Sequence, residues 1–229
     1  VKACYLIIGL LFFFVQLVSG QDQKLADSLA LIYKADQLKG TEKLELLNRL
    51  AFNEIRDPLL TLKYAEELIA LSQLEEGKEI DLASGYLYKG AALRKNGNLE
   101  GALNAFFKCA EIAIKTQNIA LENSANISLE NSANISIADV YALMGNYSNA
   151  EIYYNKAILR LRKSINLTED PDDSKRDSIK LASALLNAGD SYFNIKKYDA
   201  ALENFEEAGS IFKKTNYLFF IISICGIPS

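Results

Sequence analysis

The sequence predicts an all-α protein, an α-solenoid of stacked antiparallel helical hairpins. A pattern of small and aromatic residues recurs along the chain, and each copy follows an amphipathic segment with apolar residues at three- and four-residue spacing. Only three prolines interrupt the 229 residues, of which 50% are hydrophobic. Because one hairpin cannot bury its apolar face alone, neighbouring hairpins are expected to stack.

Residues 1–20 predict a secretory signal peptide. Lys2 precedes the apolar run 5–15, and small residues lead up to Gly20, after which we place the cleavage. The alternative is an uncleaved membrane anchor, although the run is shorter than the roughly 20 residues that a spanning helix needs. The expected location is therefore exported, either periplasmic or secreted.

The chain after the signal divides into one helix, four hairpins and a tail. Residues 21–40 contain a single helix, and the repeats are expected at about 41–77, 82–117, 129–165 and 179–215. In the first repeat, Asp57 and Pro58 mark a helix start, with aspartate as the cap and proline in the first turn. The later second helices are expected to be capped by Asn98, Asn146 and Asp199.

The recurring pattern is a small residue, an aromatic residue four positions on and another small residue three positions later. Small residues let two helix backbones approach closely, and the aromatic ring fills the space beside them. The three clear copies are Ala102, Phe106 and Cys109; Ala150, Tyr154 and Ala157; and Ala201, Phe205 and Ala208. A tight turn containing Gly97 or Gly145 joins the helices of a pair, and Tyr147 and Tyr198 belong to the same repeat pattern.

Two segments lengthen the later repeats. The octapeptide Leu-Glu-Asn-Ser-Ala-Asn-Ile-Ser occurs twice in tandem, at 121–128 and 129–136. We expect the second copy, with Ile135, to belong to a packed helix and the first to form an extension or a loop. Residues 166–177 are charged and contain a proline, which predicts a loop between repeats. The apolar residues 217–229 predict a truncated further repeat or, as an alternative, the start of a membrane anchor.

The pattern resembles the tetratricopeptide repeat over residues 42–215, most specifically at 141–157 and 187–208. The chain departs from it at Lys196 and Lys197, where glycine is usual, and at Thr61 and Leu68, where alanine is usual. The repeats are longer than the plain unit of about 34 residues. They are similar to the long-helix variant found in exported sensory arrays of bacterial signalling proteins. The resemblance implies a right-handed superhelix that binds proteins or peptides.

Several function classes are disfavoured by composition. Histidine is absent, which removes the commonest general base and transition-metal ligand, and no glycine-rich phosphate loop follows a strand pattern. We therefore expect no catalytic, cofactor or metal site. The acidic residues of 166–177 lack the spacing and central glycine of a calcium-binding loop. A net charge of −4 lacks the basic excess that a nucleic-acid partner requires.

The expected function is protein or peptide binding in a concave groove lined by the first helices. The resemblance places the candidate groove residues at Arg94, Lys95, Asp139, Asn187, Asp190 and Asn194. One interpretation is the extracytoplasmic sensory array of a bacterial signal-transduction protein whose output domain lies outside this chain. The other is a free-standing secreted scaffold or assembly factor. Contact with a membrane is expected only through the signal segment or a missing C-terminal part.

Overall fold

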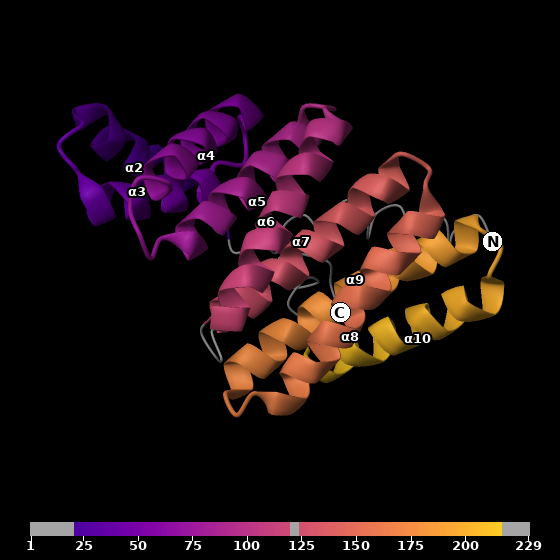
Figure 1. Ribbon diagram of the computed structural model, residues 1–229. Coiled ribbons are helices and arrows are strands. Elements are labelled where there is room, and N and C mark those ends of the chain that lie inside the picture. The colour runs from indigo at the N-terminus through magenta and orange to yellow at the C-terminus, as the bar shows by residue number, and fades with distance from the viewer. Residues whose placement is uncertain (1–20, 120–123, 217–229) are drawn as a thin grey trace, which may run out of the picture.

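The computed structural model describes residues 21–119 and 124–216, which form nine α-helices and contain no strand (Figure 1). The prediction of an all-α solenoid is therefore confirmed. The helices are α2 (Gln23–Ala35), α3 (Gly40–Asn53), α4 (Pro58–Ser72), α5 (Glu79–Lys95), α6 (Leu99–Ile119), α7 (Ser124–Leu143), α8 (Tyr147–Leu167), α9 (Pro171–Asn194) and α10 (Tyr198–Lys214).

Eight of these helices form four consecutive hairpins, α3/α4, α5/α6, α7/α8 and α9/α10, and α2 packs on α3. The second helix of each hairpin packs against the first helix of the next, so the array runs in chain order from α2 to α10 (Figure 1). The first helices α3, α5, α7 and α9 also contact one another in series. The described second helices do not contact one another to a comparable extent. The first helices therefore lie together on one side of the stack.

The turns inside three hairpins share one geometry. Gly97 and Gly145 have φ of 79° and 74°, in the left-handed region that glycine adopts without a steric penalty. Their N–H groups donate to carbonyls three residues back, and the next N–H donates to a carbonyl five residues back. In the last hairpin Lys196 takes the same position with φ of 64°. The turn geometry is therefore kept where the sequence departs from glycine.

The helix starts agree with the expected caps in three places. Asp57, before Pro58, accepts hydrogen bonds from the N–H groups of Leu59 and Leu60. Asn98 and Asn146 likewise accept from N–H groups three residues on. The prediction for Asp199 is wrong: α10 begins at Tyr198, so Asp199 lies in the first turn, where its negative charge still favours the helix N-terminus.

The loop predicted at 166–177 is wrong for most of its length. α8 continues to Leu167 and α9 begins at Pro171, which leaves only Thr168–Asp170 as the connection. The side chain of Asp170 accepts from the N–H groups of Asp172 and Asp173, and Pro171 occupies the first turn. A capping aspartate followed by proline starts a helix here, as it does at α4.

The core consists of small and aromatic side chains at the crossing points of the helices. Ala102, Ala150 and Ala201 are buried, and the rings of Phe106 and Tyr154 are 0% and 2% exposed. The ring of Phe106 lies so close to Gly90 that a Cβ there would come within 2.5 Å of it. The last ring of the pattern, Phe205, is 37% exposed. The second and third hairpins are thus covered by a following helix, and the last hairpin is not covered by any described one.

The octapeptide duplication lengthens α7. The second copy, 129–136, lies in the packed part of the helix, and Ile135 packs against the core cluster of the last two hairpins, as predicted. The first copy is helical from Ser124, so its described part extends α7. The duplication also buries polar groups: Asn131 and Asn134 are 1% and 0% exposed, and both Asn134 side-chain atoms lack a hydrogen-bond partner.

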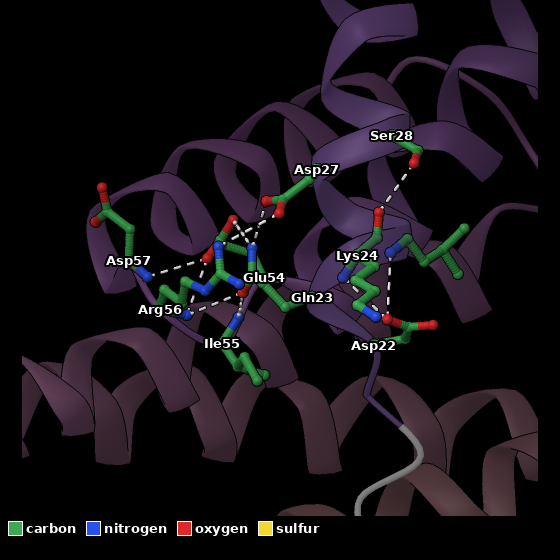
Figure 2. A network of polar contacts seen from close by, with 10 residues as sticks. Asp22, Gln23, Lys24, Asp27, Ser28, Glu54, Ile55, Arg56 and Asp57 are labelled. Atoms are coloured by element: carbon green, nitrogen blue, oxygen red, sulfur yellow. Dashed lines mark hydrogen bonds and ion pairs between the residues drawn. The ribbon is translucent and has the colours of Figure 1, made fainter.

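A polar network fixes α2 onto the first hairpin (Figure 2). The Gln23 amide donates to Glu54 at 3.0 Å and accepts from the N–H groups of Ile55 and Arg56. Glu54 in turn accepts from the N–H groups of Arg56 and Asp57. The amide of Gln23 and the carboxylate of Glu54 thereby satisfy the backbone of the turn that joins α3 to α4.

The predicted signal peptide at 1–20 and the apolar tail at 217–229 lie outside the described residues. Among the described helices, none has the combination of length and apolar composition that crossing a bilayer demands.

Candidate functional site

Polar side chains tie the first helices together on the side where they meet. We call the surface formed by α3, α5, α7 and α9 the first-helix face. Between α3 and α5, the Asn48 amide donates to Asp81 at 3.2 Å and accepts from the Tyr88 hydroxyl at 3.0 Å. Between α7 and α9, the Lys180 ammonium donates to the Ser128 hydroxyl at 2.8 Å. Arg94 on α5 and Asp139 on α7 make the corresponding contact between the middle two first helices, so each pair of consecutive first helices is joined by a polar contact.

The centre of this face is Asp139 on α7. Its Oδ2 lies 2.9 Å from Nη1 of Arg94 on α5. Its Oδ1 accepts from the Tyr154 hydroxyl at 2.6 Å and from the Asn187 amide on α9 at 3.1 Å. Three of the six predicted groove residues, Arg94, Asp139 and Asn187, are therefore brought into direct contact.

The central contacts lie partly out of water. The side chains of Arg94 and Asp139 are 25% and 23% exposed. The pKa of Tyr154 is well above its usual value because its hydroxyl is buried and, secondly, because the Asp139 carboxylate lies beside it. Tyr154 therefore stays a neutral donor, and Asp139 has both oxygens engaged. Arg94 is a planar guanidinium with five N–H donors, of which this geometry shows one used on Asp139.

The other three predicted residues, Lys95, Asp190 and Asn194, lie near the C-terminal ends of α5 and α9 and do not join this cluster. Asn194 donates to the backbone carbonyl of Asp190 at 2.8 Å and to its carboxylate at 3.3 Å. Burial raises the pKa of Asp190, and within the described part of the chain no cation pairs with it. Lys95 reaches the surface at the end of α5, and its pKa is lowered by partial burial and then by Arg94.

Asn48, Tyr88 and Lys180 also belong to this face and were not among the residues predicted for it. A signal for them exists in the spacing, because residues seven apart on a helix differ by about 20° in direction and lie on one face. Asp81, Tyr88 and Lys95 follow this spacing on α5, and Lys180, Asn187 and Asn194 follow it on α9. The role of Tyr154 was also missed, because its place in the repeat pattern explained it as a core residue.

Two other kinds of site were sought among the described residues, a metal centre and a reactive thiol. No group of three or more histidine, cysteine or acidic side chains among them is placed to hold a metal ion. Cys109 is 0% exposed, and burial raises the pKa of its thiol to about 12, so the reactive thiolate does not form near neutral pH. Hydrogen bonding and ion pairing on the first-helix face are therefore the chemistry that this arrangement supports.

Comparison with families of known proteins identifies two segments. The model described as tetratricopeptide repeat matches residues 182–214, which cover most of α9 and all of α10. The model described as the MIT domain of katanin p60 subunit A1 matches residues 132–178, from the middle of α7 through α8 into α9. No curated protein matches the chain.

Solved structures with the same fold include helical-repeat proteins. The apo form of RapI superposes with a TM-score of 0.64 at 18% identity over 85% of this chain, which spans 63% of the length of that structure. MamA gives 0.54 at 17% identity over 84% of this chain and 89% of its own. A Podosopora anserina putative kinesin light chain with TPR-like repeats gives 0.53 at 17% identity, over 84% and 86%. The chain therefore has the fold of a helical-repeat solenoid, and its residues 182–214 match the tetratricopeptide repeat.

Proposed function

We propose that the chain is an interaction module that binds an extended or helical peptide segment of a partner protein along the first-helix face. The observation that carries this proposal is the row of half-buried hydrogen-bonding groups across α3, α5, α7 and α9. Groups that are already partly desolvated bind a ligand with a smaller loss of hydration. Helices that contact one another hold these groups at fixed spacing, which reduces the entropy lost on binding.

The hydrogen-bonding groups of the first-helix face that are not fully used within the fold indicate which chemical groups a ligand would present. Asp139 is saturated by three donors, so it holds Arg94 in place. Asp190 is half-buried, and among the described side chains its carboxylate accepts a hydrogen bond from the Asn194 amide alone. Burial raises its pKa, so a cation or N–H donor placed beside it would stabilise its charged form. The ligand that fits best presents a basic or amide group to Asp190 and a carbonyl or carboxylate to Arg94.

The proposal is tested by selecting binders from a random peptide display library against the full chain. The enriched peptides are then measured against two variants by fluorescence anisotropy. Asp190→Arg reverses the charge on the first-helix face, and Lys108→Glu reverses a charge on the exposed outer side of α6. We expect Asp190→Arg to weaken binding at least tenfold and Lys108→Glu to leave the affinity unchanged.

Two results would oppose the proposal. Peptides whose affinity falls with Lys108→Glu but not with Asp190→Arg would place the binding surface on the second helices. A library that yields no enriched sequence on the folded chain, verified by circular dichroism, would count against peptide recognition as such. Both variants lie on exposed or half-exposed positions, so neither is expected to unfold the solenoid.

We propose further that the module acts outside the cytoplasm, as the sensory array of a bacterial signalling protein. The support for this is the signal-peptide pattern of residues 1–20 and the length of the repeats. A fusion of the chain to alkaline phosphatase, which is active only after export, tests the location. The gene sequence beyond the codon of Ser229 tests the role, because a sensor requires a membrane helix and an output domain. Without them, a secreted scaffold is the better interpretation.

A further inference from the structure

The outer side of α8 carries exposed apolar and basic residues in a single row. Ile152 and Leu159 lie seven residues apart and are 59% and 72% exposed. Lys156 and Lys163 are exposed as well, and each follows one of these apolar residues by four positions. Residues seven apart on a helix differ by about 20° in direction and residues four apart by about 40°. The four side chains therefore leave the helix on one side, and we call them the α8 row.

The positive charge of the α8 row is not balanced by other residues of the helix. Residues 152–168 include four basic residues and no acidic one. The two arginines of this range pair with Glu130 and Glu207. Ion pairs along a helix join residues three or four apart, and no acidic residue lies at that distance from Lys156 or Lys163. Within the described part of the chain, neither ammonium group has a hydrogen bond or an ion pair.

The outer side of α6, the preceding second helix, has the same lysine spacing but different chemistry between the lysines. Lys108 and Lys115 are exposed and seven residues apart. Glu111 lies between them and pairs with Lys108 at 3.1 Å, at the position where α8 has Leu159. Among the described side chains of α6, no large apolar residue is as exposed as Leu159. The α8 row therefore differs from its counterpart both in exposed apolar surface and in uncompensated positive charge.

We propose that the α8 row binds an amphipathic helix of a partner protein, one that presents apolar and acidic residues at the same spacing. Apolar side chains of that helix cover Ile152 and Leu159, and its carboxylates pair with Lys156 and Lys163. Two helices that cross at a small angle keep such rows in register over about three turns, because both rise about 1.5 Å per residue. The site lies on a second helix, so it is independent of any ligand on the first-helix face.

The surroundings of α8 favour a narrow acidic partner over an anionic membrane. A basic helix with exposed apolar residues is also typical of proteins that bind membrane surfaces. A bilayer is broad, however, and α10 adjoins α8 on the outer surface, where Arg162 and Glu207 pair at 2.6 Å. The same helix exposes Glu203 and Glu206, and these carboxylates would repel anionic lipid headgroups. A single helix can cover the α8 row without covering α10.

The probe is a display library of helical peptides selected on the full chain. Every member repeats a seven-residue unit with leucine at the first position and glutamate at the fifth, and the other positions vary. The affinity of the enriched peptides is measured by fluorescence anisotropy. We expect the double variant Lys156→Glu/Lys163→Glu to weaken binding about tenfold, because two attractions become repulsions. Leu159→Ser should weaken it about fivefold, because it removes apolar surface from the contact.

The matched control is Lys108→Glu/Lys115→Glu, which changes the net charge equally and at the same spacing on α6. It should change the affinity by less than about twofold, because salt screens charges that are not in contact. Equal losses in the two double variants would mean that the peptides respond to net charge alone, which overturns the proposal. A library without any enriched sequence, on a chain shown to be folded by circular dichroism, overturns it too. Binding to phosphatidylglycerol vesicles that only the α8 double variant loses, without peptide binding, would assign the row to a membrane instead.

Discussion

Asp139 on α7 accepts from Arg94 of the preceding hairpin at 2.9 Å and from Asn187 of the following one at 3.1 Å. One carboxylate thus joins three consecutive hairpins. The stability of a solenoid is approximately a sum of terms for each repeat and for each interface between neighbours. Asp139 contributes to both interfaces of the third hairpin, so its effect on stability is expected to exceed that of an ordinary ion pair.

Replacing this carboxylate should destabilise the whole array. Asp139→Ala leaves the Arg94 guanidinium and the Tyr154 hydroxyl without their acceptor, which we expect to lower the free energy of unfolding by about 1–3 kcal/mol. The value stays below that for a fully buried pair because water reaches about a quarter of both side chains. Urea denaturation measures it. Glu111→Ala, which removes the exposed partner of Lys108, should change stability by less than about 0.5 kcal/mol; equal effects would contradict the account.

The turn of the last hairpin offers a stabilising change. Lys196 has φ of 64°, where a side chain costs about 1 kcal/mol relative to glycine. Glycine relieves this strain but also increases the conformational entropy of the unfolded chain, which opposes the gain. The net effect of Lys196→Gly is therefore expected to be a rise of about 0.5–1 kcal/mol in the free energy of unfolding. The reverse control is Gly97→Ala at the equivalent turn, with φ of 79°, which should lower it. A loss of stability in both variants would show that Lys196 makes a compensating contact.

The buried asparagine of the duplicated octapeptide is expected to cost stability. Asn134 is fully buried and neither of its amide atoms has a partner. Asn134→Ala should therefore raise the free energy of unfolding by about 1 kcal/mol, because it removes an unpaired polar group and improves helix propensity. The neighbouring core residue Ile137 gives the contrast, since Ile137→Ala should lower it by about 2–4 kcal/mol. If Asn134→Ala is as harmful as Ile137→Ala, the amide is bonded in solution.

The buried thiol of Cys109 is expected to make the protein less stable at alkaline pH. Burial raises the pKa of its thiol from 9.0 to about 12. Below pH 9 the thiol is neutral in both states. Between pH 9 and 12 only the unfolded chain releases the proton, so stability falls as the pH rises, by about 1.4 kcal/mol per unit for one such group.

The measurement is urea unfolding at pH 8 and pH 10.5. Cys109→Ala should lose about 2 kcal/mol less than the unmodified chain between these two pH values, because one titrating group is removed. Buried Tyr154, whose pKa is also raised, contributes equally to both proteins, whereas the pKa of Tyr88 is raised by burial and then by Cys109, so its contribution is smaller in the variant. The same slope in both proteins would mean that the thiol ionises in the fold.

Local signals in the sequence predicted the helical hairpins well. Glycine at 97 and 145 and the Asp57-Pro58 pair act through backbone conformation and short-range hydrogen bonds, so they can be read without knowing the rest of the fold. The same rule applies at Asp170-Pro171, where the density of charges nevertheless predicts a loop. A charged segment is compatible with a helix whose outer side faces water.

The contacts of the first-helix face could be predicted only in part. The resemblance to tetratricopeptide repeats pointed to Arg94, Asp139 and Asn187, but not to their mutual bonds. Those bonds depend on the rotation between consecutive hairpins, which the sequence does not specify residue by residue. Tyr154 shows the difficulty: its ring belongs to the core and its hydroxyl to the polar cluster. The domain limits and the groove residues remain predictions.

The most direct test of the proposed function is an NMR titration of the full chain with a peptide enriched by selection. Backbone amide shifts report which helices the peptide touches. The account predicts that the shifts that change are concentrated on α5, α7 and α9, around Arg94, Asn187 and Asp190, with the outer surfaces of α4, α6 and α8 unaffected. Shift changes confined to the second helices α4, α6, α8 and α10 would contradict binding on the first-helix face.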